Sequence, residues 1–284
     1  MHNSKGFTLI FLILTISTIF LVTAVSIAKK INSSEKFRLK ILQNTGQPTP
    51  TPYQFPYNNP VIPKNGSYRI IIVGDSIVAS LGINANTLRK ELIQLYPDSE
   101  FVTYNYGYPA TNIETLTDRL TQTTSDRVTD HPAILEQGFE LIIIESFAYN
   151  PLSHLMLSEG LKKQNEILEK SVNLILNKKP NTALAFLTPP AFDSKNFARG
   201  TYDLTAEVRQ SWIKERTAYI ENHIRFAKSL DIPVIDVYSL SKNSDGKVKK
   251  ELISGDFIHP SQKGVDFISK TIADFIYQNK IFPE

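Results

Sequence analysis

Five short apolar runs, separated by stretches of helical periodicity, constrain the fold of this chain more than any other feature. Each run has the length of a β-strand, and three are almost wholly apolar, as strands buried on both faces of a parallel sheet are. The runs are residues 69–73, 101–105, 141–145, 183–187 and 233–237. The helical stretches are residues 87–95, 113–120, 159–176, 204–230 and 262–278. This alternation predicts a three-layer α/β/α sandwich around a flavodoxin-like, five-stranded parallel sheet.

The beginning of the chain has a different character. Residues 7–28 carry no charge, and as a helix they extend about 33 Å, which is enough to cross a bilayer. We therefore expect residues 1–44 to form a membrane anchor with its juxtamembrane segment. A cleaved signal peptide is the alternative, because Ser26 and Ala28 are small residues at the spacing of a cleavage site.

A proline-rich segment, residues 45–66, follows the anchor. It holds six of the 16 prolines of the chain. Because proline fixes φ and removes a hydrogen-bond donor, the segment is predicted to be an extended spacer between the anchor and a domain at 67–284. The alternative is a strap packed over the domain through Tyr53, Phe55 and Tyr57.

Charge is divided unevenly between these parts. Residues 1–66 hold seven Lys and Arg against Glu35 alone, whereas residues 67–284 hold 24 Lys and Arg against 27 Asp and Glu. A domain without a basic excess is not suited to neutralise a row of phosphates, which argues against nucleic-acid binding. The positive charges that follow the apolar stretch favour a cytoplasmic domain by the positive-inside rule. The short N-terminal tail, the likeness to an export signal and the spacer favour an extracytoplasmic domain, which we expect.

The types of residue present limit the available chemistry. The chain has no cysteine, and its five histidines lack the spacing typical of zinc ligands, so neither a metal nor an organic cofactor is expected. His223 falls inside a predicted helix and is expected on its surface. Trp212 and Tyr219 lie seven residues apart on the same helix, a spacing typical of a core stripe, with a substrate platform as the alternative.

Two polar sequences lie where a parallel sheet binds its ligands, beyond the carboxyl ends of its strands. Ser76 follows the first strand, in a turn that can expose its hydroxyl, although a helix cap or a plain turn is the alternative. Near the C-terminus, Asp256 precedes His259 by three residues. That spacing lets a carboxylate bind one imidazole nitrogen and leaves the other free to accept a proton. A capped loop with a surface histidine is the alternative, since Ser261 suits a helix N-cap.

Taken together, these sequences make the chain resemble the SGNH/GDSL hydrolases. The resemblance extends from residue 68 to the C-terminus and rests on IIVGDSI at 71–77, NYG at 105–107, the run 141–145 leading to Asn150, and DFIHPS at 256–261. It implies that Ser76 is the nucleophile, His259 the general base and Asp256 the group that orients His259. It also implies an oxyanion hole formed by the backbone N–H groups of Ser76 and Gly107 and the side-chain amide of Asn150.

The expected function is that of a membrane-anchored serine esterase. Its substrate is expected to be an O-acyl group of a cell-envelope glycan or a lipid, cleaved through an acyl-serine intermediate. An acyltransferase that serves an envelope polymer and a non-catalytic surface-binding module of the same fold are the alternatives. The Gly-x-Ser-x-Gly type of serine hydrolase is disfavoured, because Val78 replaces the second glycine. The sequence does not specify the oligomeric state.

Overall fold

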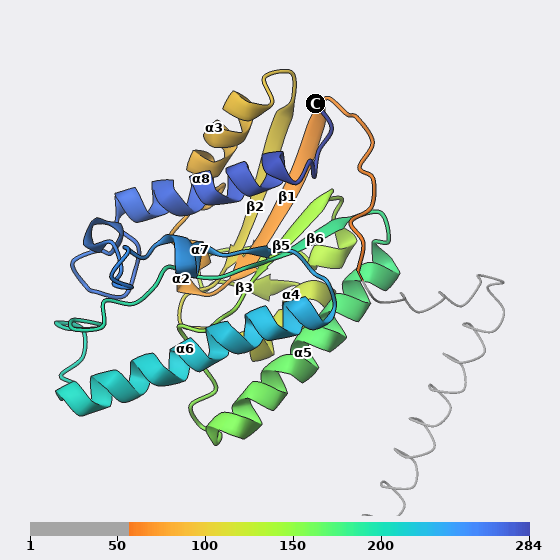
Figure 1. Cartoon of the computed structure of the whole chain (residues 1–284). Helices are drawn as coiled ribbons and strands as arrows, with labels where there is room; N and C mark the ends of the chain where they lie inside the picture. The colour runs from red at the N-terminus through yellow and green to blue at the C-terminus, as the bar shows by residue number, and fades with distance from the viewer. Residues whose placement is uncertain (1–56) are drawn as a thin grey trace, which may run out of the picture. The chain divides into compact units, whose positions relative to one another are not determined.

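The computed structural model describes residues 57–284 (Figure 1). The predicted transmembrane segment, residues 7–28, lies outside the described residues. Within residues 57–284, no helix has both the length and the apolar character needed to cross a membrane.

A five-stranded parallel sheet forms the middle layer, in the strand order β2-β1-β5-β6-β7. Its strands are β1 (Ser67–Gly74), β2 (Glu100–Gly107), β5 (Leu141–Glu145), β6 (Ala183–Leu187) and β7 (Val234–Ile235). The register sets Gly74 beside Gly107 and Val73 beside Ile144. The chain leaves β1 towards β2 and later returns to the other side of β1 as β5. The carboxyl ends of these strands therefore border the crevice where such sheets bind ligands.

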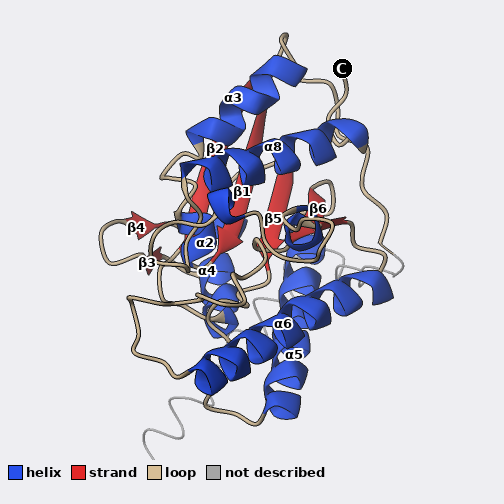
Figure 2. Ribbon diagram, turned by 60° about the vertical axis from the view of Figure 1, so that its left-hand side comes forward, coloured by secondary structure: helices blue, strands red, loops and turns tan. Residues whose placement is uncertain are grey.

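Helices cover both faces of the sheet, as the alternation in the sequence predicts (Figures 1 and 2). One face carries α3 and α8, and the other carries α4, α5 and α6. Their bounds are α3 (Asn86–Leu95), α4 (Leu116–Thr121), α5 (Leu157–Lys178), α6 (Ala206–Ser229) and α8 (Gln262–Gln278). Shorter elements complete the domain: α2 (Ser76–Ala79), α7 (Val237–Leu240), the 3-10 turns at Ile113–Thr115, Ile134–Glu136 and Lys250–Leu252, and an antiparallel pair, β3 (Thr124–Ser125) and β4 (Asp130–His131).

Local chemistry sets where elements end. The predicted run 233–237 supplies only two strand residues, because the Asp236 carboxylate accepts a hydrogen bond from the Ser239 N–H (3.0 Å) and starts α7. The last helix, α8, has the predicted bounds. Ser261 caps it, and Ile268 and Ile272 are buried on its inner face.

His223 differs from its prediction. It lies on the inner face of α6 rather than on the helix surface, fully buried, with its ring stacked on Phe186 of β6 at 4.3 Å between centroids. The periodicity of α6 is weak because polar residues also face the sheet, so the sequence pattern did not separate its two sides. Burial lowers the pKa of His223 to about 3, and the residue is therefore neutral at physiological pH.

Residues 57–66 of the proline-rich segment pack along the domain, in the way of the strap alternative rather than of a free spacer. Tyr57 and Ile62 are buried. The backbone N–H of Tyr57 donates to the Leu230 carbonyl (2.8 Å), and its hydroxyl accepts from the Leu184 N–H (2.7 Å). The packed domain therefore begins by Tyr57 rather than at residue 67. The rest of the segment, residues 45–56, lies outside the described residues.

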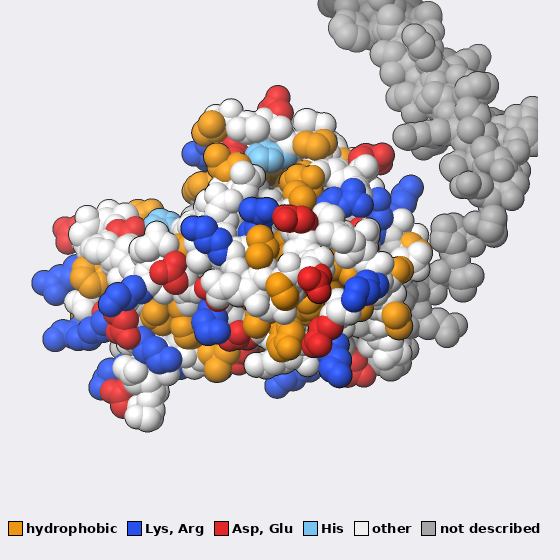
Figure 3. All heavy atoms as spheres, turned by 90° about the horizontal axis from the view of Figure 1, so that it is seen from above, with side chains coloured by type: hydrophobic (Ala, Val, Ile, Leu, Met, Phe, Trp, Pro, Cys, Tyr) orange, Lys and Arg blue, Asp and Glu red, His pale blue; other side chains and the backbone are white. Residues whose placement is uncertain are grey.

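Charged side chains are mixed over the surface of the domain. In the view of Figure 3, Lys and Arg alternate with Asp and Glu across one face. This mixing agrees with the small acidic balance of residues 67–284 and shows no broad basic patch on that face.

Candidate active site

Ser76 lies in a tight turn where β1 passes into α2. The carboxylate of Asp75 accepts a hydrogen bond from the Ile77 N–H (2.9 Å) and so caps α2. Gly74 allows the turn to be tight, since a Cβ there would lie 2.3 Å from Val78 Cγ2 and 2.8 Å from Glu145 Cβ. Ser76 itself is half-buried, and its backbone N–H is one of the free donors at the start of a helix.

The predicted Asp–His pair is formed. His259 Nδ1 lies 2.6 Å from Asp256 Oδ2. The other carboxylate oxygen of Asp256 accepts the backbone N–H groups of Ile258 (2.9 Å) and His259 (3.0 Å) and the hydroxyl of Ser254. Partial burial raises the pKa of Asp256, but these hydrogen bonds outweigh burial and hold it well below its ordinary value. Asp256 is therefore an anion that fixes the ring of His259 and leaves Nε2 as the free nitrogen.

One cavity brings the two ends of the sequence together. Ser76, Asn150 and His259 all line it, and its volume is ≈ 270 Å³. Within residues 57–284, the Ser76 hydroxyl makes no direct hydrogen bond to His259; such bonds are often long in a free enzyme and tighten on substrate binding. A larger cavity of ≈ 700 Å³ lies between β7 and α8 and includes neither Ser76 nor His259. The smaller cavity is therefore the candidate active site, because it holds the nucleophile and the base.

Asn150 reaches the cavity from the loop after β5. Its Nδ2 donates to Asp75 Oδ2 at 3.0 Å. Asp75 is fully buried; burial raises its pKa, while hydrogen bonds from Ile77 and Asn150 favour the anion. The amide of Asn150 has a second N–H that this bond leaves free. Asn150 therefore lines the cavity, and its role as an oxyanion donor stays a prediction.

Gly107 does not fit its predicted role. Its N–H donates to the side-chain oxygen of Asn105 at 2.7 Å, and Gly107 does not line the cavity. A Cβ at this position would lie 2.2 Å from the Ala79 nitrogen, so the glycine is needed for close packing between β2 and α2. The N–H of Gly107 is therefore already used within the fold.

Ala110 is the residue of this loop that faces the cavity, and it is not among the site residues predicted from the sequence. It lines the cavity together with Ser76, and within residues 57–284 no hydrogen bond engages its N–H. Its backbone is left-handed, with φ +55°. Positive φ at an alanine leaves no mark in a sequence pattern. Its proximity to Ser76 makes its N–H, rather than that of Gly107, the candidate third donor.

A buried cation, Arg119 of α4, connects the loops that carry Ser76 and Ala110. Its guanidinium donates to the carbonyl oxygens of Gly74 (2.6 Å) and Tyr106 (2.7 Å), at the ends of β1 and β2. It also donates to the hydroxyls of Thr111 (2.5 Å) and Thr115 (2.7 Å). Burial lowers the pKa of Arg119 to about 10, which leaves it cationic at neutral pH.

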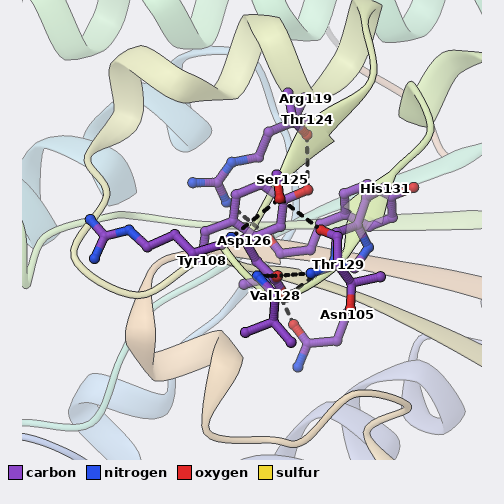
Figure 4. Close-up of polar contacts among 12 residues, drawn as sticks. Asn105, Tyr108, Arg119, Thr124, Ser125, Asp126, Val128, Thr129 and His131 are labelled. Carbon is purple, nitrogen blue, oxygen red and sulfur yellow. Dashed lines mark hydrogen bonds and ion pairs between the residues drawn. The ribbon is translucent and has the colours of Figure 1, made fainter.

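The hairpin of β3 and β4 packs against this arginine through Tyr108 (Figure 4). The Arg119 guanidinium lies 4.0 Å from the centre of the Tyr108 ring, and the Tyr108 hydroxyl is 2.8 Å from Thr124 Oγ1. A second Asp–His pair, Asp126 with His131 at 3.2 Å, closes the hairpin. Neither of these two residues lines the cavity of Ser76, so their role is to hold the hairpin.

Trp212 and Arg216 of α6 form another wall of the cavity. Trp212 is partly buried and packs against the core, as a core stripe implies, but it also lines the cavity, whereas Tyr219 is fully buried as predicted. The difference arises because Trp212 belongs to the first turns of α6, where the helix borders the loops beyond the sheet. Helical periodicity does not reveal where the sheet beneath a helix ends. Within residues 57–284, no cluster of three His, Asp or Glu side chains is arranged to hold a metal ion.

The sequence matches no family model and no curated protein. Solved structures do resemble it. A lipase/acylhydrolase from Enterococcus faecalis superposes with a TM-score of 0.53 at 21% identity, covering 75% of this chain and 96% of that one. An acetylxylan esterase from Geobacillus stearothermophilus superposes with a TM-score of 0.53 at 16% identity, covering 78% and 97%. The chain has the SGNH-hydrolase fold. At these identities the likeness shows the fold and not the reaction.

Proposed function

We propose that this chain is a serine esterase that hydrolyses an O-acyl ester through an acyl-Ser76 intermediate. The observation that carries the proposal is the single cavity lined by Ser76, Asn150 and His259, with His259 bound to the Asp256 carboxylate. Ser76 and Asn150 follow β1 and β5, and His259 precedes α8. A purely structural role does not require these three distant segments to meet. The acylhydrolase and esterase names of the structural neighbours support the same reaction class.

The reaction follows from the positions of these groups. His259 Nε2 takes the proton of the Ser76 hydroxyl as Oγ attacks the ester carbonyl carbon. The oxyanion that forms is stabilised by the N–H groups of Ser76 and Ala110 and the amide of Asn150, each donor contributing about 3 kcal/mol. The imidazolium then gives its proton to the departing alcohol. Water, deprotonated by His259, attacks the acyl-enzyme and releases the acid, while ionised Asp256 stabilises the imidazolium in both steps.

The substrate is a short acyl ester, preferably an acetyl group on a carbohydrate. The cavity of ≈ 270 Å³ lies below the roughly 300–1,000 Å³ typical of small-molecule sites, and a long acyl chain needs more room. The structural neighbours include both an acetylxylan esterase and a lipase/acylhydrolase, so the cavity volume is what favours the glycan alternative.

The proposed setting is the outer surface of a membrane. Residues 7–28 are apolar over a membrane-spanning length, and the proline-rich segment follows them. An esterase anchored in this way has access to cell-envelope glycans. Protease added to intact cells should remove the domain, and a domain protected from protease would place it on the other side.

Hydrolysis by the full-length protein in detergent tests the proposed reaction. We expect Ser76-dependent release of acetate from 4-nitrophenyl acetate and acetylated xylo-oligosaccharides, and little turnover of the decanoate ester. Ser76→Ala should lower kcat by about 10⁴ to 10⁶. Ser80→Ala is the matched control, because Ser80 is one turn further along the chain and bonds only the Ser76 carbonyl (2.8 Å). Equal turnover by Ser76→Ala and the parent protein would contradict the proposal, and acetate transfer to a glycan acceptor in place of water would change the reaction class.

A further inference from the structure

Arg216 is a cation built into the wall of the cavity. Its Nε donates to the Tyr149 carbonyl (3.2 Å) and its Nη1 to the Trp212 carbonyl (3.2 Å). Only 11% of its side chain is exposed. A cation held this firmly has lost most of its freedom before any ligand arrives, which lowers the entropic cost of binding.

The third nitrogen of Arg216 is left for a ligand. Within residues 57–284, Nη2 makes no hydrogen bond. Several fully buried polar atoms of this part of the chain lack a partner, and Nη2 is not one of them. Nη2 is therefore not fully buried, and Arg216 is one of the residues that line the cavity. Glu215 is near Nη1, at 3.6 Å, and does not engage Nη2.

The charges around the cavity favour an anion. Of the described residues that line it, none is an aspartate, glutamate or lysine, and Arg216 is the one permanent charge. Asp75 is buried behind Asn150 and is already bonded by its amide. The ionised Asp256 lies behind His259, which it binds at 2.6 Å, so a negative group beside Arg216 meets no carboxylate among the lining residues.

Aromatic rings beside Arg216 suit a sugar. The guanidinium lies 4.7 Å from the centre of the Trp212 ring, and Trp212 makes an edge contact with Tyr202 at 5.4 Å. Tyr202 is 52% exposed at the mouth of the cavity. Aromatic faces bury apolar surface while their rims stay near water, which matches the C–H face and hydroxyl rim of a sugar ring.

We propose that Arg216 binds an anionic group of the ester substrate, so that the preferred substrate is an acylated acidic sugar. The acyl group lies at Ser76, the ring packs against Trp212 and Tyr202, and a carboxylate or phosphate on the same or the neighbouring sugar receives hydrogen bonds from Nη2. The substrate class rests on the proposed esterase function, whereas the anion site itself does not require turnover. The planar guanidinium group of arginine can bind a carboxylate or a phosphate. The binding measurement distinguishes these two anions.

Binding is measured without catalysis through Trp212, the single tryptophan of the chain. Its fluorescence is followed as glucose, glucuronate or glucose 6-phosphate is added to the full-length Ser76→Ala protein in detergent. One or both anions should bind with a Kd roughly tenfold to a hundredfold below that of glucose, as expected for hydrogen bonds to a charged group. The better of the two anions identifies the substrate group as carboxylate or phosphate.

Variants assign the effect to Arg216. Arg216→Gln should remove the preference for the anion, and Arg216→Lys, which keeps the charge without the fork, should retain part of it. Arg225→Gln is the matched control, since Arg225 is 61% exposed on the same helix and pairs only with Glu221. Thermal unfolding of each variant shows whether loss of the Tyr149 contact has disturbed the fold.

Two results would overturn the anion site. One is equal affinity of the Ser76→Ala protein for glucose and both anions, which needs no variant of Arg216. The other is the same loss of preference in Arg225→Gln as in Arg216→Gln. A protein that binds the anions as expected but shows no Ser76-dependent ester turnover would retain the anion site and refute the esterase function.

Discussion

Asn150 Nδ2 lies 3.0 Å from Asp75 Oδ2, so the residue that precedes the nucleophile also holds the amide that lines the cavity. Asp75 has no exposed surface, and its other oxygen caps α2 through the Ile77 N–H. One buried carboxylate therefore fixes both the turn of Ser76 and the orientation of Asn150. The geometry of the oxyanion donors is set before substrate binds, which is the condition for strong electrostatic catalysis.

Loss of the Asn150 amide should slow the chemical step. Asn150→Ala removes one oxyanion donor, and we expect kcat to fall by about 10² to 10³ with a small change in KM. Steady-state hydrolysis of 4-nitrophenyl acetate measures both constants. Asn177→Ala, at an exposed position of α5, is the control. An increase in KM with kcat unchanged would show instead that Asn150 binds the ground state and the transition state equally and gives no specific stabilisation of the oxyanion.

Asp256 should act through His259 rather than on the substrate. Asp256→Asn removes the anion that stabilises the imidazolium and favours the wrong tautomer of the ring. We expect kcat to fall by about 10⁴, the size of this effect in the serine protease triad. Asp266→Asn, on the exposed face of α8, is the control. A loss below tenfold in Asp256→Asn would mean that another group orients His259.

Arg119 should be essential to the fold around the site. Lysine at this position keeps the charge but cannot reach the carbonyl oxygens of Gly74 and Tyr106 and the hydroxyl of Thr111 at once. We expect Arg119→Lys to lower the free energy of unfolding by about 3 kcal/mol, because buried groups lose their partners. Urea unfolding measures the loss. Arg225→Lys is the control, because Arg225 is 61% exposed and its ion pair with Glu221 lies at the surface. This variant should change the free energy of unfolding by less than about 1 kcal/mol.

His223 should make the domain less stable in mild acid. Its pKa is about 3 in the folded protein, against 6.5 for an ordinary histidine, so between these values the unfolded chain binds a proton that the folded chain does not. The free energy of unfolding therefore has its full value above pH 6.5. Below that pH it falls by about 1.4 kcal/mol per pH unit because of this one group.

The test compares His223→Phe, which keeps a stacked ring, with the parent protein in urea at pH 7 and pH 5. Between pH 7 and pH 5, the free energy of unfolding of the parent protein should fall by about 2 kcal/mol more than that of the variant. His154→Gln, at an exposed position, should behave like the parent. Identical pH dependence in His223→Phe and the parent would show that His223 does not titrate during unfolding.

The sequence predicted the parts of the fold that depend on short-range pattern. The runs around Ile71 and Ile143 are apolar on both faces, and only the centre of a parallel sheet buries both faces of a strand. The Asp256–His259 pair is likewise local, since a three-residue turn brings the two side chains together. Ser76 was predictable because its turn follows directly after such a strand.

The remaining features depend on contacts between distant segments. The sequence pattern places Arg216 and Trp212 at ordinary positions of a helix. Only the packing of α6 beside the Ser76 cavity shows that both residues line it. Gly107 stood out as the glycine of its loop, yet its N–H is taken by Asn105 and the cavity is lined by Ala110 instead. The sequence pattern does not show which backbone N–H of the loop after β2 remains free. The packing of α2 and α4 against this loop decides it.

Covalent labelling of Ser76 tests the central claim most directly. The full-length protein is treated with a fluorophosphonate, and the site and stoichiometry of the adduct are read by mass spectrometry. We expect one adduct per chain, located on Ser76, lost in Ser76→Ala, strongly slowed in His259→Ala, and unchanged in Ser80→Ala. Labelling that persists in Ser76→Ala, or an unlabelled parent protein, would contradict the account of Ser76 as an activated nucleophile.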